Sequence, residues 1–200
     1  MKKILHIVSS PRGGASYSIR LGEAIIEKLL AAYPGSTVKT VDLVKQHWPH
    51  LEEAHLTSFF TPTDKHTDND REAIRHSEAA IADIREADIL VIGAPMYNFS
   101  IHSTLKAWID HIVRSGVTFS YSEKGPEGLI KGKKVYVAES TGGVYSEGPM
   151  KQNNFIEPYL QFILGFIGLN DITFVRAEGL SIPDLKDTAL EKAIGQLSLN

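Results

Sequence analysis

The chain contains no cysteine among its 200 residues, which excludes disulfides, thiol catalysis and cysteine-ligated metal centres. No run of lysine and arginine occurs and the formal charge is −3, so we expect no nucleic-acid partner. The longest apolar stretch, 159–169, is too short to cross a bilayer. The first apolar run, Ile4 to Val8, is too short for a signal peptide. These absences predict a cytoplasmic protein with no membrane partner.

Several catalytic motifs are also missing. Neither G-x-x-x-x-G-K-[ST] nor G-x-G-x-x-G occurs, which disfavours nucleoside triphosphatases and Rossmann-type dinucleotide binding. The eight histidines are scattered and none stands in H-E-x-x-H, so we expect no metal site. Ser140 lacks the G-x-S-x-G elbow of serine hydrolases.

The sequence that remains alternates between strand and helix patterns over the whole of 1–200. Strands are expected at 4–8, 37–43, 88–92, 135–138 and 172–177, with helices after the first strand and at 74–84, 102–112, 159–167 and 185–197. This alternation predicts an α/β fold, a doubly wound five-stranded parallel sheet of flavodoxin-like order 2-1-3-4-5, with helices on both faces. We expect a single domain with an irregular insertion around 47–70 and a long active-site loop around 116–132.

Three polar junctions follow strands of this sheet. They are 9–18 (SSPRGGASYS), 93–100 (GAPMYNFS) and 140–143 (STGG). Because loops at the carboxyl ends of parallel strands meet at one edge, the three junctions predict a single ligand site.

The first junction leads into a helix amino terminus, where N–H groups and the helix dipole favour an anion. Ser10, Ser16 and Ser18 add hydroxyl donors. A phosphate ester such as that of FMN fits this junction, and a serine-rich turn that caps a helix is the alternative. Met96, Tyr97 and Phe99 offer apolar surface for a flat ring, whereas Gly142 and Gly143 allow close approach of the backbone.

Taken together, these motifs resemble one family. They are Ser10-Pro11-Arg12-Gly13 with Ser16 and Ser18, the stretch 94–99 (APMYNF), the stretch 116–129 with GVTF and GPEGL, and Ser140 with Gly142-Gly143. The chain is similar in these motifs to the bacterial FMN-dependent NADH:quinone oxidoreductases and NADH-azoreductases.

The resemblance implies a homodimer with one FMN per subunit and NADH as co-substrate. It implies a ping-pong reaction in which a quinone or an azo compound is the acceptor, and hydride chemistry at the flavin without a catalytic side chain. The FMN contacts that it implies are Ser10, Ser16, Tyr17, Ser18, Met96, Tyr97, Asn98, Phe99, Ser140, Thr141, Gly142 and Gly143. Tyr121, Tyr145 and His102 are candidates for the substrate pocket.

Two alternatives stay open at this point: a flavodoxin-type electron carrier and a general NAD(P)H:FMN reductase. A carrier usually presents a strongly acidic docking face, of which a net charge of −3 gives little sign. The physiological acceptor, the preference between NADH and NADPH, and the relative quinone and azo activities are not decided by the sequence.

Overall fold

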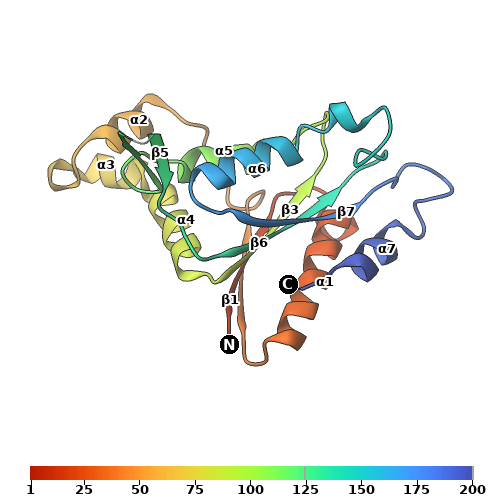
Figure 1. Ribbon diagram of the computed structural model, residues 1–200. Coiled ribbons are helices and arrows are strands. Elements are labelled where there is room, and N and C mark those ends of the chain that lie inside the picture. Colours follow the sequence, from red (N-terminus) through yellow and green to blue (C-terminus); the bar gives the residue numbers. More distant parts are fainter. Residues whose placement is uncertain (124, 200) are drawn as a thin grey trace.

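A computed structural model describes residues 1–123 and 125–199 of the chain. Its centre is a parallel sheet in the order β2-β1-β3-β6-β7 (Figure 1). The strands are β1 (Lys3–Val8), β2 (Thr37–Asp42), β3 (Ile89–Pro95), β6 (Lys134–Ser140) and β7 (Asp171–Ala177). Numbered along this sheet alone, the order is the predicted 2-1-3-4-5, so the fold class is confirmed.

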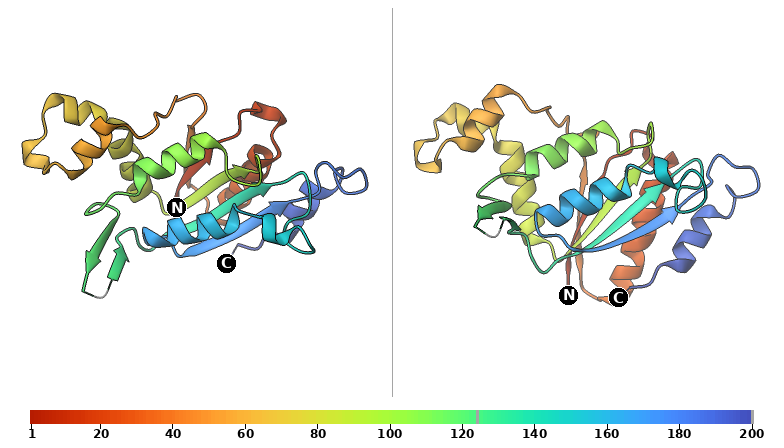
Figure 2. Two further views of the ribbon diagram at one scale, coloured as in Figure 1. Left: turned by 90° about the horizontal axis from the view of Figure 1, so that it is seen from above. Right: turned by 45° about the horizontal axis from the view of Figure 1, so that its top comes forward.

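Helices cover both faces of the sheet (Figure 2). One face carries α1 (Tyr17–Ala32) and α7 (Ala189–Gln196). The other carries α4 (Arg75–Glu86), α5 (Ser103–Ile112) and α6 (Glu157–Phe166). The C-terminal helix is shorter than the expected 185–197, because residues 185–188 form a turn closed by hydrogen bonds to the Ile182 carbonyl.

The central strands are apolar because both of their sides are buried. In β6, Val135 and Val137 pack under α5 and α6, whereas Tyr136 and Ala138 pack under α1 and α7. All seven residues of β3 are buried. The sheet therefore holds the carboxyl ends of β1, β3 and β6 side by side, where the three junctions emerge.

The expected insertion around 47–70 carries two short helices, α2 (Glu53–Phe60) and α3 (Asp68–Ala73), with a 3₁₀ turn at Thr63–Lys65 between them. A capping box starts α3, in which Thr67 and Asp70 bond to each other's backbone N–H groups. Rings from the insertion, including that of the buried His55, pack on His111 of α5.

The segment 116–132, expected to be a loop, contains an antiparallel hairpin of β4 (Phe119–Ser122) and β5 (Gly125–Gly128). Gly125-Pro126-Glu127-Gly128 has the composition of a turn, yet it pairs as a strand with 119–122. Hydrogen bonds from Leu129 to Thr118 and from Ile130 to Ile167 fix its base. Seen from above, the hairpin and the insertion lie at one end of the molecule, and the segment 140–155 lies at the other (Figure 2).

Candidate functional site

The first junction combines buried hydroxyl groups with an open helix end. Ser9, Ser10, Ser16 and Ser18 are buried, and the hydroxyls of Ser16 and Ser18 lie 3.0 Å apart. Ser16 is the N-cap residue of α1, but its side chain accepts no hydrogen bond from a backbone N–H group of the helix. The first N–H groups of a helix have no partner inside the helix, so those of α1 stay available to an anion.

The second junction is a strained two-residue turn. Tyr97 and Ser100 exchange backbone hydrogen bonds of 2.9 and 3.0 Å. Asn98 (φ 49°) and Phe99 (φ 68°) between them occupy the left-handed region, which is unusual for phenylalanine. Strain of this kind gathers at functional sites.

The backbone N–H groups of this turn are only partly available. Met96 donates to the Ser140 carbonyl at 2.9 Å, and Tyr97 donates to Ser100. No hydrogen bond within the described residues uses the N–H groups of Asn98 and Phe99. In this turn, therefore, the N–H groups of Asn98 and Phe99 are the ones that can donate to a ligand.

In the third junction, the carbonyl groups accept hydrogen bonds from the protein, whereas two backbone N–H groups have no acceptor among the described residues. The carbonyls of Thr141, Gly142 and Gly143 accept hydrogen bonds from residues 179–181. Among the described residues, no hydrogen bond uses the N–H groups of Gly142 and Gly143. These two amides can act as donors to a ligand.

Direct contacts join the three junctions. The Ser9 hydroxyl donates to the Gly93 carbonyl at 2.7 Å, and the Met96–Ser140 bond ties the second junction to the third. The rings of Phe99 and Tyr145 meet edge to face at 6.3 Å. The structure therefore brings the predicted residues of all three junctions to one edge of the sheet.

His102 and Tyr145 lie at this edge, and Tyr121 does not. His102 caps α5 through Thr104, and its ring meets Tyr97 at 5.3 Å. Partial burial lowers the pKa of His102, which favours the neutral ring. Tyr121 projects from the hairpin beside the carboxyl end of α6, and 70% of it is exposed. In this chain it is separated from the site by the length of α6.

Three residues outside the predicted set support the site. Glu178 accepts hydrogen bonds from the N–H groups of Tyr145 and Ser146 and from the Ser146 hydroxyl, and so clamps the chain after Gly143. Phe155 donates to the Phe99 carbonyl, and Asn154 accepts from the first N–H groups of α6. The sequence shows Asn154 three residues before Glu157, which is the spacing of a capping box, although the N-cap residue of α6 is Ile156.

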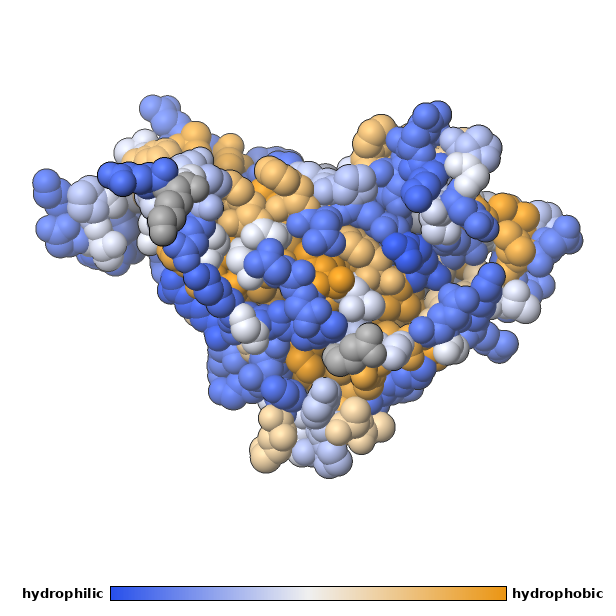
Figure 3. Space-filling model, in the orientation of Figure 1, coloured by the Kyte–Doolittle hydropathy of each residue, from blue (hydrophilic) through white to orange (hydrophobic). Residues whose placement is uncertain are grey.

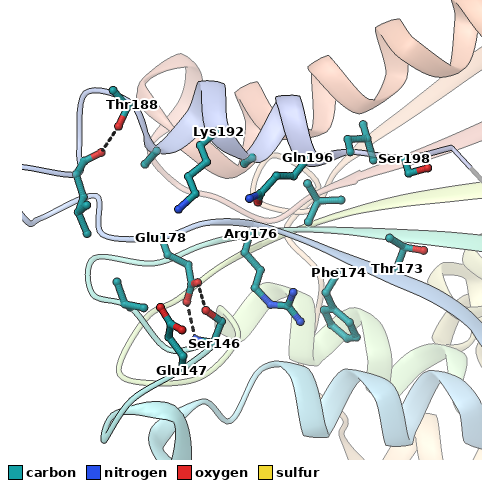
Figure 4. Close-up of a pocket in the computed structure, with 16 residues that line it drawn as sticks. Ser146, Glu147, Thr173, Phe174, Arg176, Glu178, Thr188, Lys192, Gln196 and Ser198 are labelled. Carbon is teal, nitrogen blue, oxygen red and sulfur yellow. Dashed lines mark hydrogen bonds between the residues drawn. The ribbon is translucent and has the colours of Figure 1, made fainter.

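Two cavities lie along the open edge of β7, next to the third junction. The larger, about 570 Å³, lies between β7 and α7 and is lined by Arg176, Glu178 and Lys192 (Figure 4). The other, about 380 Å³, is lined by Tyr145, Asn154 and the side of α6. Neither cavity is lined by residues of the three junctions.

Comparison with known proteins identifies the family. The model of a family described as having a flavodoxin-like fold matches residues 2–199. The chain belongs to this family. It is 47% identical over 182 residues to an FMN-dependent NADH:quinone oxidoreductase of Herminiimonas arsenicoxydans, covering 91% of this chain and 89% of the relative. It is 42% identical to a protein of the same name from Mesorhizobium japonicum, with 97% and 93% covered.

A solved structure is also similar to this chain in its fold. An azoreductase from Bacillus anthracis superposes with a TM-score of 0.90 at 30% identity, covering 98% of this chain and 96% of the other. The resemblance stated from the motifs is thereby confirmed. Within residues 1–123 and 125–199, no helix is long and apolar enough to cross a membrane.

Proposed function

We propose that this flavodoxin-like chain binds FMN where the three junctions meet and transfers two electrons from NADH to a quinone or an azo bond. The proposal rests on the start of α1, where the first backbone N–H groups have no partner inside the helix and the hydroxyls of Ser16 and Ser18 are buried. At the same edge of the sheet, the loops after β3 and β6 carry main-chain amides that no hydrogen bond uses among the described residues. The names of the relatives at 47% and 42% identity and of the azoreductase support the same activity.

The residues present fit FMN in both of its parts. Ser10, Ser16, Tyr17 and Ser18 would hold the phosphate, because hydroxyl and main-chain donors at a helix start bind anions without a lysine. Asn98 and Phe99, with the loop Ser140–Gly143, would hold the ring system through unused amides. Met96 and Tyr97, which are both partly buried, would supply apolar surface beside it.

Bound FMN would supply the two-electron chemistry. The amides of Gly142 and Gly143 would act as fixed donors to negative charge, as oxyanion-hole donors do. His102 and Tyr145 flank the turn that carries Phe99, so we place them in the pocket that NADH and the acceptor use in turn.

An aromatic strip supports the proposed homodimer. Rings follow one another from α6 to the hairpin: Phe162–Phe166 at 6.1 Å, Phe166–Phe119 at 4.6 Å and Phe119–Tyr121 at 5.5 Å. Phe162 is 68% exposed, and apolar surface shows over α6 in Figure 3. Exposed apolar patches of this kind are typical of protein interfaces. In a dimer, Tyr121 of one subunit would reach the site of the other.

Cytoplasm is the compartment that we propose, because NADH is available there.

Initial-rate kinetics test the function. Purified chain reconstituted with FMN should oxidise NADH with a benzoquinone, giving parallel double-reciprocal lines as expected for alternating substrates, and should decolourise an azo dye. Protein that binds FMN but is not reduced by NADH would be an electron carrier, and the proposal would be wrong.

A further inference from the structure

The end of β6 holds a buried carboxyl group that the proposed reaction does not use. Glu139 is 1% exposed and directly precedes Ser140, the first residue of the third junction. Its Oε1 accepts a hydrogen bond of 3.2 Å from the Asn154 amide. Its Oε2 has no donor among the described residues. Burial of an ionised carboxylate with so few donors is costly.

The cation opposite Glu139 is paired with a second carboxyl group. Arg176 lies opposite Glu139 in the β6–β7 register, but its guanidinium makes two bonds, of 2.5 and 2.6 Å, to Glu157. Figure 4 shows Arg176 at the wall of the β7 cavity. The Asn154 amide also donates to Glu157, at 3.3 Å. The two carboxyl groups thus share one amide, whereas the guanidinium makes hydrogen bonds to Glu157 alone.

This arrangement favours one proton between the two carboxyl groups. Burial, and then the charge of Glu157, raise the pKa of Glu139 to about 8. Burial alone would raise the pKa of Glu157, but the hydrogen bonds and charge of Arg176 lower it. Glu178 also faces Glu139 and raises its pKa, and Lys151 lines the same cavity as Glu157. A proton on Glu139 that is donated to Glu157 accounts for the oxygen without a donor.

Glu139 and Glu157 are connected, through hydrogen bonds and neighbouring residues, to both loops that would hold the flavin ring. Asn154 bonds to both carboxyl groups, and the next residue, Phe155, donates to the Phe99 carbonyl at 3.2 Å. On the other side, the Ser140 carbonyl accepts from Met96. A change in the spacing of the carboxyl groups is therefore passed to the 96–99 turn and to the 140–143 loop.

We propose that Glu139 and Glu157 share a proton and that Glu139 is a positioning residue for the flavin site. With the proton present, the pair holds the two loops at the spacing described. Loss of the proton leaves two repelling carboxylates and places negative charge one residue from the 140–143 loop. This inference rests on the proposed function.

The test is the dissociation constant for FMN, measured by quenching of flavin fluorescence between pH 6.5 and 9.5. Wild-type protein should lose affinity above pH 8, by up to about tenfold per pH unit for one linked proton. Glu139→Gln, which cannot ionise, should show no such step. Glu147→Gln removes an exposed carboxylate of the neighbouring cavity and should follow wild type. Ionisation of the FMN phosphate, near pH 6, affects all three proteins equally.

An alkaline step of equal size in Glu139→Gln, or its absence from wild type, would overturn the inference. A second readout needs no variant: wild-type protein without FMN should show an infrared band of a protonated carboxylic acid that disappears between pH 7 and 9.5. Absence of that band would also overturn it. If the chain binds no FMN at any pH, the proposed function fails. If bound FMN is reduced by NADH but its affinity lacks the step, this inference alone fails.

Discussion

Acid should weaken the fold through one buried histidine beneath the helix that would hold the phosphate. His6 of β1 is 3% exposed, and its Nε2 has no partner among the described residues. The ring fills the space left by Gly22 of α1, where an added Cβ would lie 2.8 Å from Nε2. Burial lowers the pKa of His6 from 6.5 to about 4. The folded chain therefore resists protonation that the unfolded chain accepts.

The sign and size follow from linkage. Above pH 6.5 His6 is neutral in both states and has no effect on the pH dependence. As the pH falls from 6.5 to 4, only the unfolded chain takes up the proton, so stability falls. One pKa unit corresponds to about 1.4 kcal/mol, which makes the loss about 2 kcal/mol at pH 5 and about 3 kcal/mol at pH 4.

Urea unfolding of wild type and His6→Leu at pH 7.5, 6, 5 and 4 measures this loss. The free energy of unfolding should fall further in wild type than in His6→Leu, by about 2 kcal/mol at pH 5. His50→Leu, the same substitution at an exposed histidine, should follow wild type. Parallel curves for wild type and His6→Leu would refute the reasoning.

Three further predictions concern the site and the interface. Ser16→Ala combined with Ser18→Ala should weaken FMN binding roughly tenfold or more and leave riboflavin binding unchanged in a fluorescence titration. The reason is that hydrogen bonds to charged groups contribute about 1.5–3 kcal/mol. Equal losses for both flavins would contradict a phosphate role. Gly143→Val should reduce FMN retention on gel filtration more than Gly143→Ala. Even the Cβ of alanine would lie 3.1 Å from the Tyr145 ring, and valine adds two methyl groups to it. Unchanged retention would count against the assignment of Gly143 to the flavin site. Phe162→Asp should give a folded monomer in sedimentation experiments, because Phe162 is exposed in the single chain; an unchanged sedimentation coefficient would remove the aromatic strip from the interface.

The sheet could be predicted from sequence because its signals are local. The three buried strands β1, β3 and β6 contain short apolar runs, and α4 and α5 repeat apolar residues at helical spacing. Because strands and helices alternate along the chain, general rules of topology predict a parallel sheet. The same rules predict that the three junctions lie together at the carboxyl ends of its strands. Ser16, Phe99 and Gly143 were accordingly expected at one edge, and they lie there.

Other parts depend on contacts between distant residues. The Asn154–Phe155 link to Phe99 joins segments more than 50 residues apart, and no local pattern reveals it. The same is true of the Met96 amide, which is taken by Ser140 of the neighbouring strand. The hairpin at 119–128 was missed because its second strand has the composition of a turn. Long-range pairing outweighs local propensity there.

The most direct test of the account compares FMN with riboflavin, which lacks the phosphate, in an equilibrium titration of the purified chain. Since the start of α1 and its serines are proposed to hold the phosphate, FMN should saturate at one molecule per chain and riboflavin should bind far more weakly. Equal affinity for the two flavins, or protein that stays colourless in excess FMN, would contradict the central claim.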